Sequence, residues 1–237
     1  MFALILSDMP PFIARPHVLP WPLPDAPTLA VQLIEFTAEA FTPAAFAAHA
    51  LALPAHIERS VRKRQAEYFH GRLAARHALA AAGLPVTDIG TGTGRQPLWP
   101  VGAIGSITHN GRRAGAVALP AGAWHGVGID IESPATPEQL DSLASLAVSA
   151  DELRLLGADR DALLPLVFSA KESFYKAAYG AVGRFFDFSA VRVTAIDTDR
   201  LTFIVAEPLS PHWAVGTPVQ AHWRRLPDGD VLTAVIW

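Results

Sequence analysis

Residues 126–132 read GVGIDIE, a pattern of glycines and branched aliphatic residues that is typical of a buried strand. Two carboxylates interrupt this apolar pattern. Since side chains alternate between the two faces of a strand, Asp130 and Glu132 are expected to point the same way. Like charges at neighbouring positions of one face repel, and a desolvated carboxylate is costly without a positive partner. The stretch therefore predicts a strand with a cation close to it.

The composition limits the class of protein. The chain has 237 residues, of which 51% are hydrophobic and 17% charged, and it contains no cysteine. It is too apolar for a disordered protein, long enough for one large or two small domains, and unable to form disulfides or thiolate metal sites. The net charge is −3, so no global basic field would recruit nucleic acid or an anionic membrane.

The N-terminal run MFALILSDMPPF lacks the basic region and the cleavage site of a signal peptide, and is expected to form a first strand of the mature protein. No apolar run approaches the ~20 residues that cross a bilayer. These features predict a cytoplasmic protein without a membrane span.

In the first half, proline and helical patterns set the expected elements. Seven prolines between residues 10 and 28 exclude a helix or a central strand there and predict an extended surface segment. A strand is expected at residues 31–36, and a helical pattern runs from Thr42 to Gly83. Its last part, residues 59–82, carries a local positive charge in Arg59, Arg62, Lys63, Arg64, Arg72 and Arg76.

A turn-rich stretch that contains GTGTG at residues 90–94 precedes three expected strands. The glycine run is interpreted as a turn, because Pro97 and Pro100 exclude the helix that a dinucleotide-binding loop requires. The strands are expected at residues 105–110, 115–120 and 126–132.

The second half repeats this order of helices followed by strands. Helices are expected at residues 149–157 and 163–183, and four strands follow at 191–196, 201–206, 219–225 and 231–237. The repetition predicts an α+β fold of two similar subdomains packed together, residues 1–120 and 121–237.

The acids of the opening stretch suit a hard cation such as Mg²⁺ or Mn²⁺, although a strand end whose acids emerge into water is the simpler alternative. A third acid lies in FSAKESFYKA, residues 168–177, where a helix would place Glu172 and Lys176 on one face. Taken alone, this is also an ordinary surface pair worth ~0.3–0.5 kcal/mol.

Together, GVGIDIE and FSAKESFYKA resemble the paired signature motifs of the Sfp-type 4′-phosphopantetheinyl transferases, G-[IV]-D-[IV]-E and [WF]-x-x-K-E-[SA]-x-x-K. The upstream segments RKRQAEYFHGRLAARHAL, RQPLWP and GSITHN are similar to those of the enterobactin-synthetase branch of that family. Thr108 stands where the family more often has Ser, and Phe168 where Trp is commoner. The second motif is filled at every constrained position, by Phe168, Lys171, Glu172, Ser173 and Lys176.

The resemblance implies a pseudo-dimer with the active site in the cleft between its subdomains. It also implies transfer of the phosphopantetheine arm of coenzyme A to a serine of an apo carrier protein. Asp130, Glu132 and Glu172 would hold Mg²⁺, or Mn²⁺, on the diphosphate. Glu172, or a metal-bound water beside it, would be the base for the serine, and Lys176 would steady the phosphate. Coenzyme A would also contact Arg64, Arg72, Arg95, Thr108, His109 and, at a less favourable helical angle, Lys171.

Two other functions compete with this interpretation. A different Mg²⁺-dependent phosphodiesterase would use the same acids but would normally need further metal ligands. A non-catalytic coenzyme A-binding or carrier-docking protein would be expected to lack a metal ligand, and all three are present. The expected protein is a monomer that binds coenzyme A and a carrier protein, and the sequence does not identify the carrier.

Overall fold

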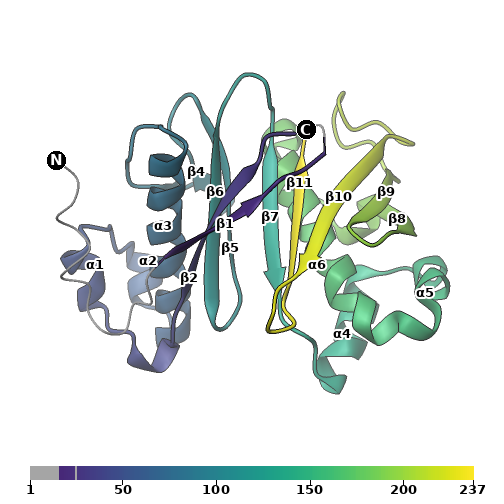
Figure 1. Ribbon diagram of the computed structural model, residues 1–237, viewed down its shortest axis with the longest axis horizontal. Helices are drawn as coiled ribbons and strands as arrows, with labels where there is room; N and C mark the ends of the chain where they lie inside the picture. The colour runs from purple at the N-terminus through teal and green to yellow at the C-terminus, as the bar shows by residue number, and fades with distance from the viewer. Residues whose placement is uncertain (1–15, 25) are drawn as a thin grey trace.

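Two sheets lie next to each other in the computed structural model, which describes residues 16–24 and 26–237 (Figure 1). One sheet has four strands and belongs to the first half of the chain, and the other has five strands from the second half. Each sheet packs against one long helix. This is the α+β arrangement of two similar halves that the sequence predicts, and the division expected after residue 120 falls in the loop between the two sheets.

The four-stranded sheet is antiparallel throughout. Pro20 lies in its edge strand, where the missing N–H breaks no central ladder. The expected extended segment is therefore confirmed there, whereas the strand expected at the N-terminus and residues 10–15 and 25 lie outside the described residues. In spatial order the strands are β1 (His17–Trp21), β2 (Leu29–Glu35), β6 (Arg113–Pro120) and β5 (Ala103–His109).

The long helix of this half is α3 (Arg62–Ala81), which packs on β6, β2 and β5. The expected continuous helix from Thr42 is wrong, because the chain forms η1 (Ala38–Ala40), α1 (Ala44–Ala48) and α2 (Ala55–Glu58) before α3 begins. Pro54 explains the break after α1, since it lacks an N–H and its ring excludes a preceding helical turn. Gly83, with φ +68°, ends the region as expected.

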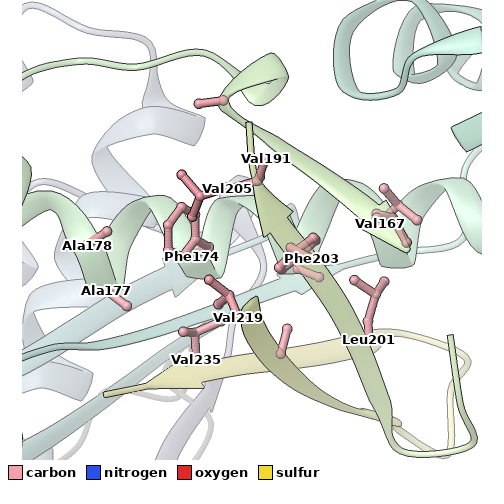
Figure 2. Packing of buried hydrophobic residues seen from close by; sticks show 14 of the residues in the cluster. Val167, Phe174, Ala177, Ala178, Val191, Leu201, Phe203, Val205, Val219 and Val235 are labelled. Carbon is pink, nitrogen blue, oxygen red and sulfur yellow. The ribbon is translucent and has the colours of Figure 1, made fainter. Parts of the chain in front are cut away.

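The five-stranded sheet is also antiparallel and packs on α6 (Arg160–Val182). Figure 2 shows Phe174 of this helix among Phe203, Val205 and Val219 of the strands. The helix ends at Gly183, which has the left-handed φ of +68°. The strands, in spatial order, are β7 (Val127–Glu132), β11 (Val231–Ile236), β10 (Pro218–Arg225), β9 (Arg200–Val205) and β8 (Val191–Ile196).

Between β7 and α6 the structure has one helix that the sequence did not predict, α4 (Pro137–Ala147). Its signal was present, because Thr136 and Gln139 form a capping box and Pro137 occupies the first turn. The helix expected at 149–157 is α5 (Ala150–Leu156). The short elements η2 (Gly157–Asp159) and η3 (Phe188–Ala190) flank α6. No helix in the described part of the chain is long and apolar enough to cross a bilayer.

The two sheets meet where β5 runs beside β7, and side-chain hydroxyl groups join them. Ser106 accepts the N–H of Ile129 at 3.0 Å, and Thr108 accepts the N–H of Ile131 at 3.1 Å. From the first bond to the second, the residue number rises by two on both strands, so β5 and β7 run parallel. The face of β7 opposite to Asp130 carries Val127, Ile129 and Ile131, which belong to a core shared with strands of the first half. The two halves are therefore fixed to each other along β7.

A buried histidine in α3 gives the first half a pH-dependent stability. His70 is 0% exposed and stacks on Phe36, with 4.4 Å between the ring centroids. Its Nδ1 donates to the carbonyl of Ala66 at 2.7 Å, and its Nε2 has no partner among the described residues. Burial lowers the pKa of His70 to about 4.

We expect the free energy of unfolding to fall as the pH drops from 6.5 to 4, since in this window the unfolded chain protonates this histidine and the folded chain does not. The loss should approach roughly 3 kcal/mol, at about 1.4 kcal/mol per unit of pKa difference. Urea unfolding of the wild type and of His70→Phe across this range measures it. His70→Phe should reduce the slope by this amount, because other buried histidines still contribute, and the exposed control His56→Gln should keep the wild-type slope. Parallel curves for wild type and His70→Phe would contradict the assignment.

Candidate active site

A cavity of about 680 Å³ opens between the two halves. Its walls come from α3, β5 and the hairpin of β3 (Gly90–Thr91) and β4 (Pro97–Leu98) on one side, and from the start of β7 and from α6 on the other. The cleft expected between the subdomains is present. Five of the residues predicted to contact coenzyme A line it: Arg64, Arg72, Arg95, His109 and Lys176.

The glycines of GVGIDIE allow α6 to lie directly on β7. A Cβ at Gly126 would come within 2.1 Å of the carbonyl oxygen of Ala177, and a Cβ at Gly128 within 1.9 Å of the carbonyl oxygen of Ser173. Real side chains do not reach such distances from a backbone atom. Glycine on this face of the strand therefore brings the helix that carries Glu172 and Lys176 up to the strand that carries the acids.

Asp130 is 4% exposed and meets both halves of the molecule. Its Oδ1 accepts the hydroxyl of Thr108 at 2.9 Å and the ammonium of Lys176 at 2.6 Å. Its Oδ2 is buried and has no partner among the described residues. The cation predicted beside the strand is therefore Lys176 in this structure, and one oxygen of the carboxylate is left for a further ligand.

The charges around this pair are unbalanced. Burial and the neighbouring Asp130 raise the pKa of Glu132 to about 8, although Lys176 opposes the shift. Burial also raises the pKa of Glu172, and Lys176 again opposes it. Burial would lower the pKa of Lys176, but the acids outweigh this and raise it. Lys176 therefore stays protonated at neutral pH and does not neutralise all three acids.

These acids fit a hard divalent cation. The buried Oδ2 of Asp130 lacks a partner among the described residues, and burial together with the charge of Asp130 disfavours the ionised form of Glu132. In the described residues, no three His, Asp or Glu side chains are gathered closely enough to enclose a metal ion by themselves. Mg²⁺ commonly binds to one or two carboxylates and completes its shell with water and substrate phosphates, so the arrangement suits this ion.

His109 sits between a base and an acid on the α3 wall of the cavity. Arg64 donates to its Nε2 at 2.9 Å, and its Nδ1 lies 3.7 Å from Oε2 of Glu67. A guanidinium only donates hydrogen bonds, so Nε2 must be the unprotonated nitrogen. Burial lowers the pKa of His109, in agreement with a neutral ring. Glu67 is a cavity residue that the sequence analysis missed, because a lone acid in a basic helix carries no pattern of its own.

Arg72 is held by the hairpin on the same wall. Its guanidinium lies over the ring of Tyr68, 4.5 Å from the centroid, and donates to the hydroxyl of Thr91 at 2.9 Å and the carbonyl of Gly90 at 3.2 Å. Its Nε is buried without a partner among the described residues. Burial lowers the pKa of Arg72, but a guanidinium remains charged at neutral pH. Arg72 thus adds a positive group to the wall of the cavity.

The tip of the hairpin carries Arg95 in the left-handed region, with φ +66°. Its N–H donates to the carbonyl of Gly92 at 2.9 Å, which closes the turn. Glycine is the usual residue at such a position, so a side chain here costs of order 1 kcal/mol. A Cβ at Gly94 would lie 2.3 Å from the hydroxyl of Tyr179 on α6, so the tip touches the opposite half beside the cavity, which Arg95 and Tyr179 line.

Two of the expected binding residues do not face the cavity. The ammonium of Lys171 lies on another side of α6, where it binds Glu152 at 2.7 Å and the carbonyls of Ala147 at 2.7 Å and Phe188 at 3.3 Å. These three acceptors use its three protons. The hydroxyl of Thr108 is used by Asp130 and by the N–H of Ile131. Neither group is free for a phosphate.

Comparison with known proteins gives the family. Residues 53–119 match the 4′-phosphopantetheinyl transferase N-terminal domain, and residues 126–234 match the 4′-phosphopantetheinyl transferase superfamily. The chain is 35% identical over 204 residues to enterobactin synthase component D of Salmonella typhimurium, a match that covers 82% of this chain and 82% of that protein.

Two similar proteins are named as transferases. The chain is 36% identical over 197 residues to the 4′-phosphopantetheinyl transferase Npt of Nocardia iowensis, covering 76% of this chain and 86% of that protein. It is 38% identical over 187 residues to the 4′-phosphopantetheinyl transferase Svp of Streptomyces mobaraensis, covering 76% and 75%. The chain therefore belongs to the 4′-phosphopantetheinyl transferase superfamily, as its motifs indicated.

Gly128→Ala should strongly destabilise the protein, because its methyl group would lie 1.9 Å from a main-chain oxygen of α6. We expect a loss at the upper end of the roughly 1–3 kcal/mol that overpacking costs. Gly180→Ala is the matched control in α6, where a Cβ meets no atom within 4 Å, and it should gain roughly 0.5–1 kcal/mol from helix propensity. Urea unfolding compares them, and equal effects would show that close approach is not the reason for glycine at 128.

Proposed function

We propose that this protein transfers the 4′-phosphopantetheine moiety of coenzyme A to a serine of an apo carrier protein. The products are holo carrier protein and adenosine 3′,5′-bisphosphate, and the reaction depends on Mg²⁺. The observation that carries the proposal is the ion pair of Lys176 with Asp130, since Lys176 also lines the arginine-rich cavity. Lys176 thus connects the acid-bearing strand to the cavity with the arginines, and transfer from a metal-bound diphosphate requires anion-binding and cation-binding groups close together.

The adenine nucleotide end of coenzyme A would occupy the cavity. Arg64, Arg72 and Arg95 line it, and planar guanidinium groups suit the two charges of a 3′-phosphate. His109, which is neutral, would contribute a hydrogen bond and not a charge. Lys171 and Thr108 are left out of the proposed binding set, because contacts within the protein use their polar atoms.

The acids on β7 and α6 would supply the chemistry. Asp130, Glu132 and Glu172 offer oxygen ligands for Mg²⁺, which when bound would neutralise charge on the diphosphate and on the leaving bisphosphate. Glu172 is the proposed base for the carrier serine, and burial, which raises its pKa above the usual value of a glutamate, makes it a stronger base. Lys176 remains protonated, so its ammonium could leave Asp130 and bind the negatively charged oxygens of the transferred phosphoryl group.

The competing functions differ in what they release. A Mg²⁺-dependent phosphodiesterase would give the same bisphosphate with water as the acceptor, and a non-catalytic coenzyme A-binding or carrier-docking protein would give none. Family membership and the full set of three acids favour the transferase.

The similarity to enterobactin synthase component D makes carrier domains of siderophore synthesis the first acceptors to test. Peptide, polyketide and fatty-acid carriers follow. One chain supplies both walls of the cleft, which supports a monomer with functional halves 1–120 and 121–237. Action in the cytoplasm, without nucleic acid, stays a prediction from the sequence.

Incubation with coenzyme A, Mg²⁺ and an apo carrier domain should add ~340 Da to the carrier, the mass of the transferred arm. Intact-protein mass spectrometry measures the gain, and chromatography measures the bisphosphate. A carrier whose acceptor serine is replaced by alanine is the control. Bisphosphate without a mass gain would favour the phosphodiesterase, and no product with peptidyl, aryl and acyl carriers would refute the proposal.

Glu172→Gln should lower the transfer rate at least about 100-fold, because an amide is neither a base nor an anionic metal ligand. The fold should persist, since the side chain is only half-buried. Steady-state rates together with circular dichroism measure both effects. Glu138→Gln, at the exposed start of α4, is the matched control and should keep the wild-type rate. Wild-type turnover by Glu172→Gln would remove this residue from the reaction.

A further inference from the structure

A polar network outside the cleft ties the turn between β5 and β6 to the turn between β10 and β11. Both turns lie at the lower end of the sheets in Figure 1. At its centre is Asp230, which is 0% exposed. Its carboxylate accepts hydrogen bonds from Asn110 at 2.9 Å, Arg112 at 2.8 Å and Arg113 at 2.8 Å, all from the first half of the chain. The two halves are thus clamped at this end.

The ionic part of the network extends to the surface. Asp228 accepts from Arg113 at 2.9 Å and from Arg112 at 3.3 Å, and Arg113 also binds Glu35 at 2.7 Å. Buried ion networks often contribute little net stability, because desolvation offsets attraction, but they can favour one arrangement over others. The physical effect of this network is therefore to fix how the two halves sit relative to each other.

Asn110 connects the network to the acid strand. Its Oδ1 accepts the N–H groups of Arg112 at 3.0 Å and Arg113 at 2.9 Å. Its Nδ2 donates to Asp230 and, at 3.1 Å, to the hydroxyl of Ser133. Two donors and two acceptor positions are the full capacity of an asparagine side chain, so its orientation is fixed.

These contacts hold the chain on both sides of Glu132. Thr108 binds the N–H of Ile131, the residue before it, and Asn110 binds the hydroxyl of Ser133, the residue after it. Metal ligands must be held within about 0.5 Å of their productive position, usually by supporting hydrogen bonds.

We propose that Asn110 and Ser133 are positioning residues for Glu132, anchored by the buried carboxylate of Asp230. The pair fixes the end of β7 so that Glu132 faces the cation shared with Asp130 and Glu172. This inference rests on the proposed function for the role of the metal, and it assigns no contact with substrate to Asn110 or Ser133.

Ser133→Ala tests the proposal, since it removes one hydrogen bond and leaves the turn bonds of Asn110 intact. Binding of Mn²⁺ to the coenzyme A-loaded protein, measured by isothermal titration calorimetry, should weaken roughly tenfold, the lower range for loss of a supporting contact. Amide hydrogen exchange in residues 127–134 should accelerate, and the KM for coenzyme A should stay unchanged. Ser133→Thr keeps the hydroxyl and should restore the wild-type values. Ser145→Ala, on exposed α4, is the matched control.

A wild-type Mn²⁺ affinity in Ser133→Ala would overturn the proposal, and so would equal impairment of Ser133→Thr and Ser133→Ala. Absence of Mn²⁺ binding by the wild type would overturn it as well. The calorimetric and exchange readouts do not need turnover. A wild type that binds Mn²⁺ but modifies no carrier would therefore refute the proposed function, while Ser133→Ala would still decide the positioning role.

Discussion

The hydrogen bonds that side-chain hydroxyl groups of β5 make to the backbone of β7 are the constraint on which the rest of the structure depends. A backbone ladder would force both strands into one sheet with a common twist. Ser106 and Thr108 reach across instead, so two separate sheets join edge to edge and each keeps its own helix. Because the hydroxyl of Thr108 also donates to Asp130, the same atom fixes the joint between the halves and the orientation of the central acid.

The contact between β5 and β7 determines where the charged side chains of the two halves lie. The first half contributes arginines to the cavity wall, and the second half carries the acids of β7 and α6 next to Lys176, which lines the same cavity. Lys176 is the exception, a base on the acidic side whose ammonium binds Asp130. One ammonium among three carboxylates leaves negative charge uncompensated, and burial together with the charge of Asp130 raises the pKa of Glu132. A phosphate-bound divalent cation is the ligand that both walls of the cleft would accept together.

Much of the fold follows from local patterns. Strands β2 and β5 to β11, and helices α5 and α6, agree with prediction within a few residues, because alternation and helical periodicity report which face is buried. The short strands β1, β3 and β4 were not predicted as strands. The continuous helix expected from Thr42 is wrong, because Pro54 interrupts it. Helix α4 was not predicted, although the residues of its capping box, Thr136 and Gln139, are present in the sequence. Lys171 was expected at the phosphates from its motif, but its angle on α6 turns it towards Glu152. No sequence pattern marked Glu67 as a site residue, and only the structure shows that it lies beside His109.

The sequence by itself determined the identity of the acids, their common face on β7, and the family to which the chain belongs. These depend on residue type and spacing, which are local properties. Only the tertiary structure decided that Lys176 is the partner of Asp130, that Gly126 and Gly128 exist to admit α6, and that Asn110 holds the residue next to Glu132. Each of these contacts joins segments distant in sequence, so its energy depends on how the two halves dock and not on any pattern along the chain.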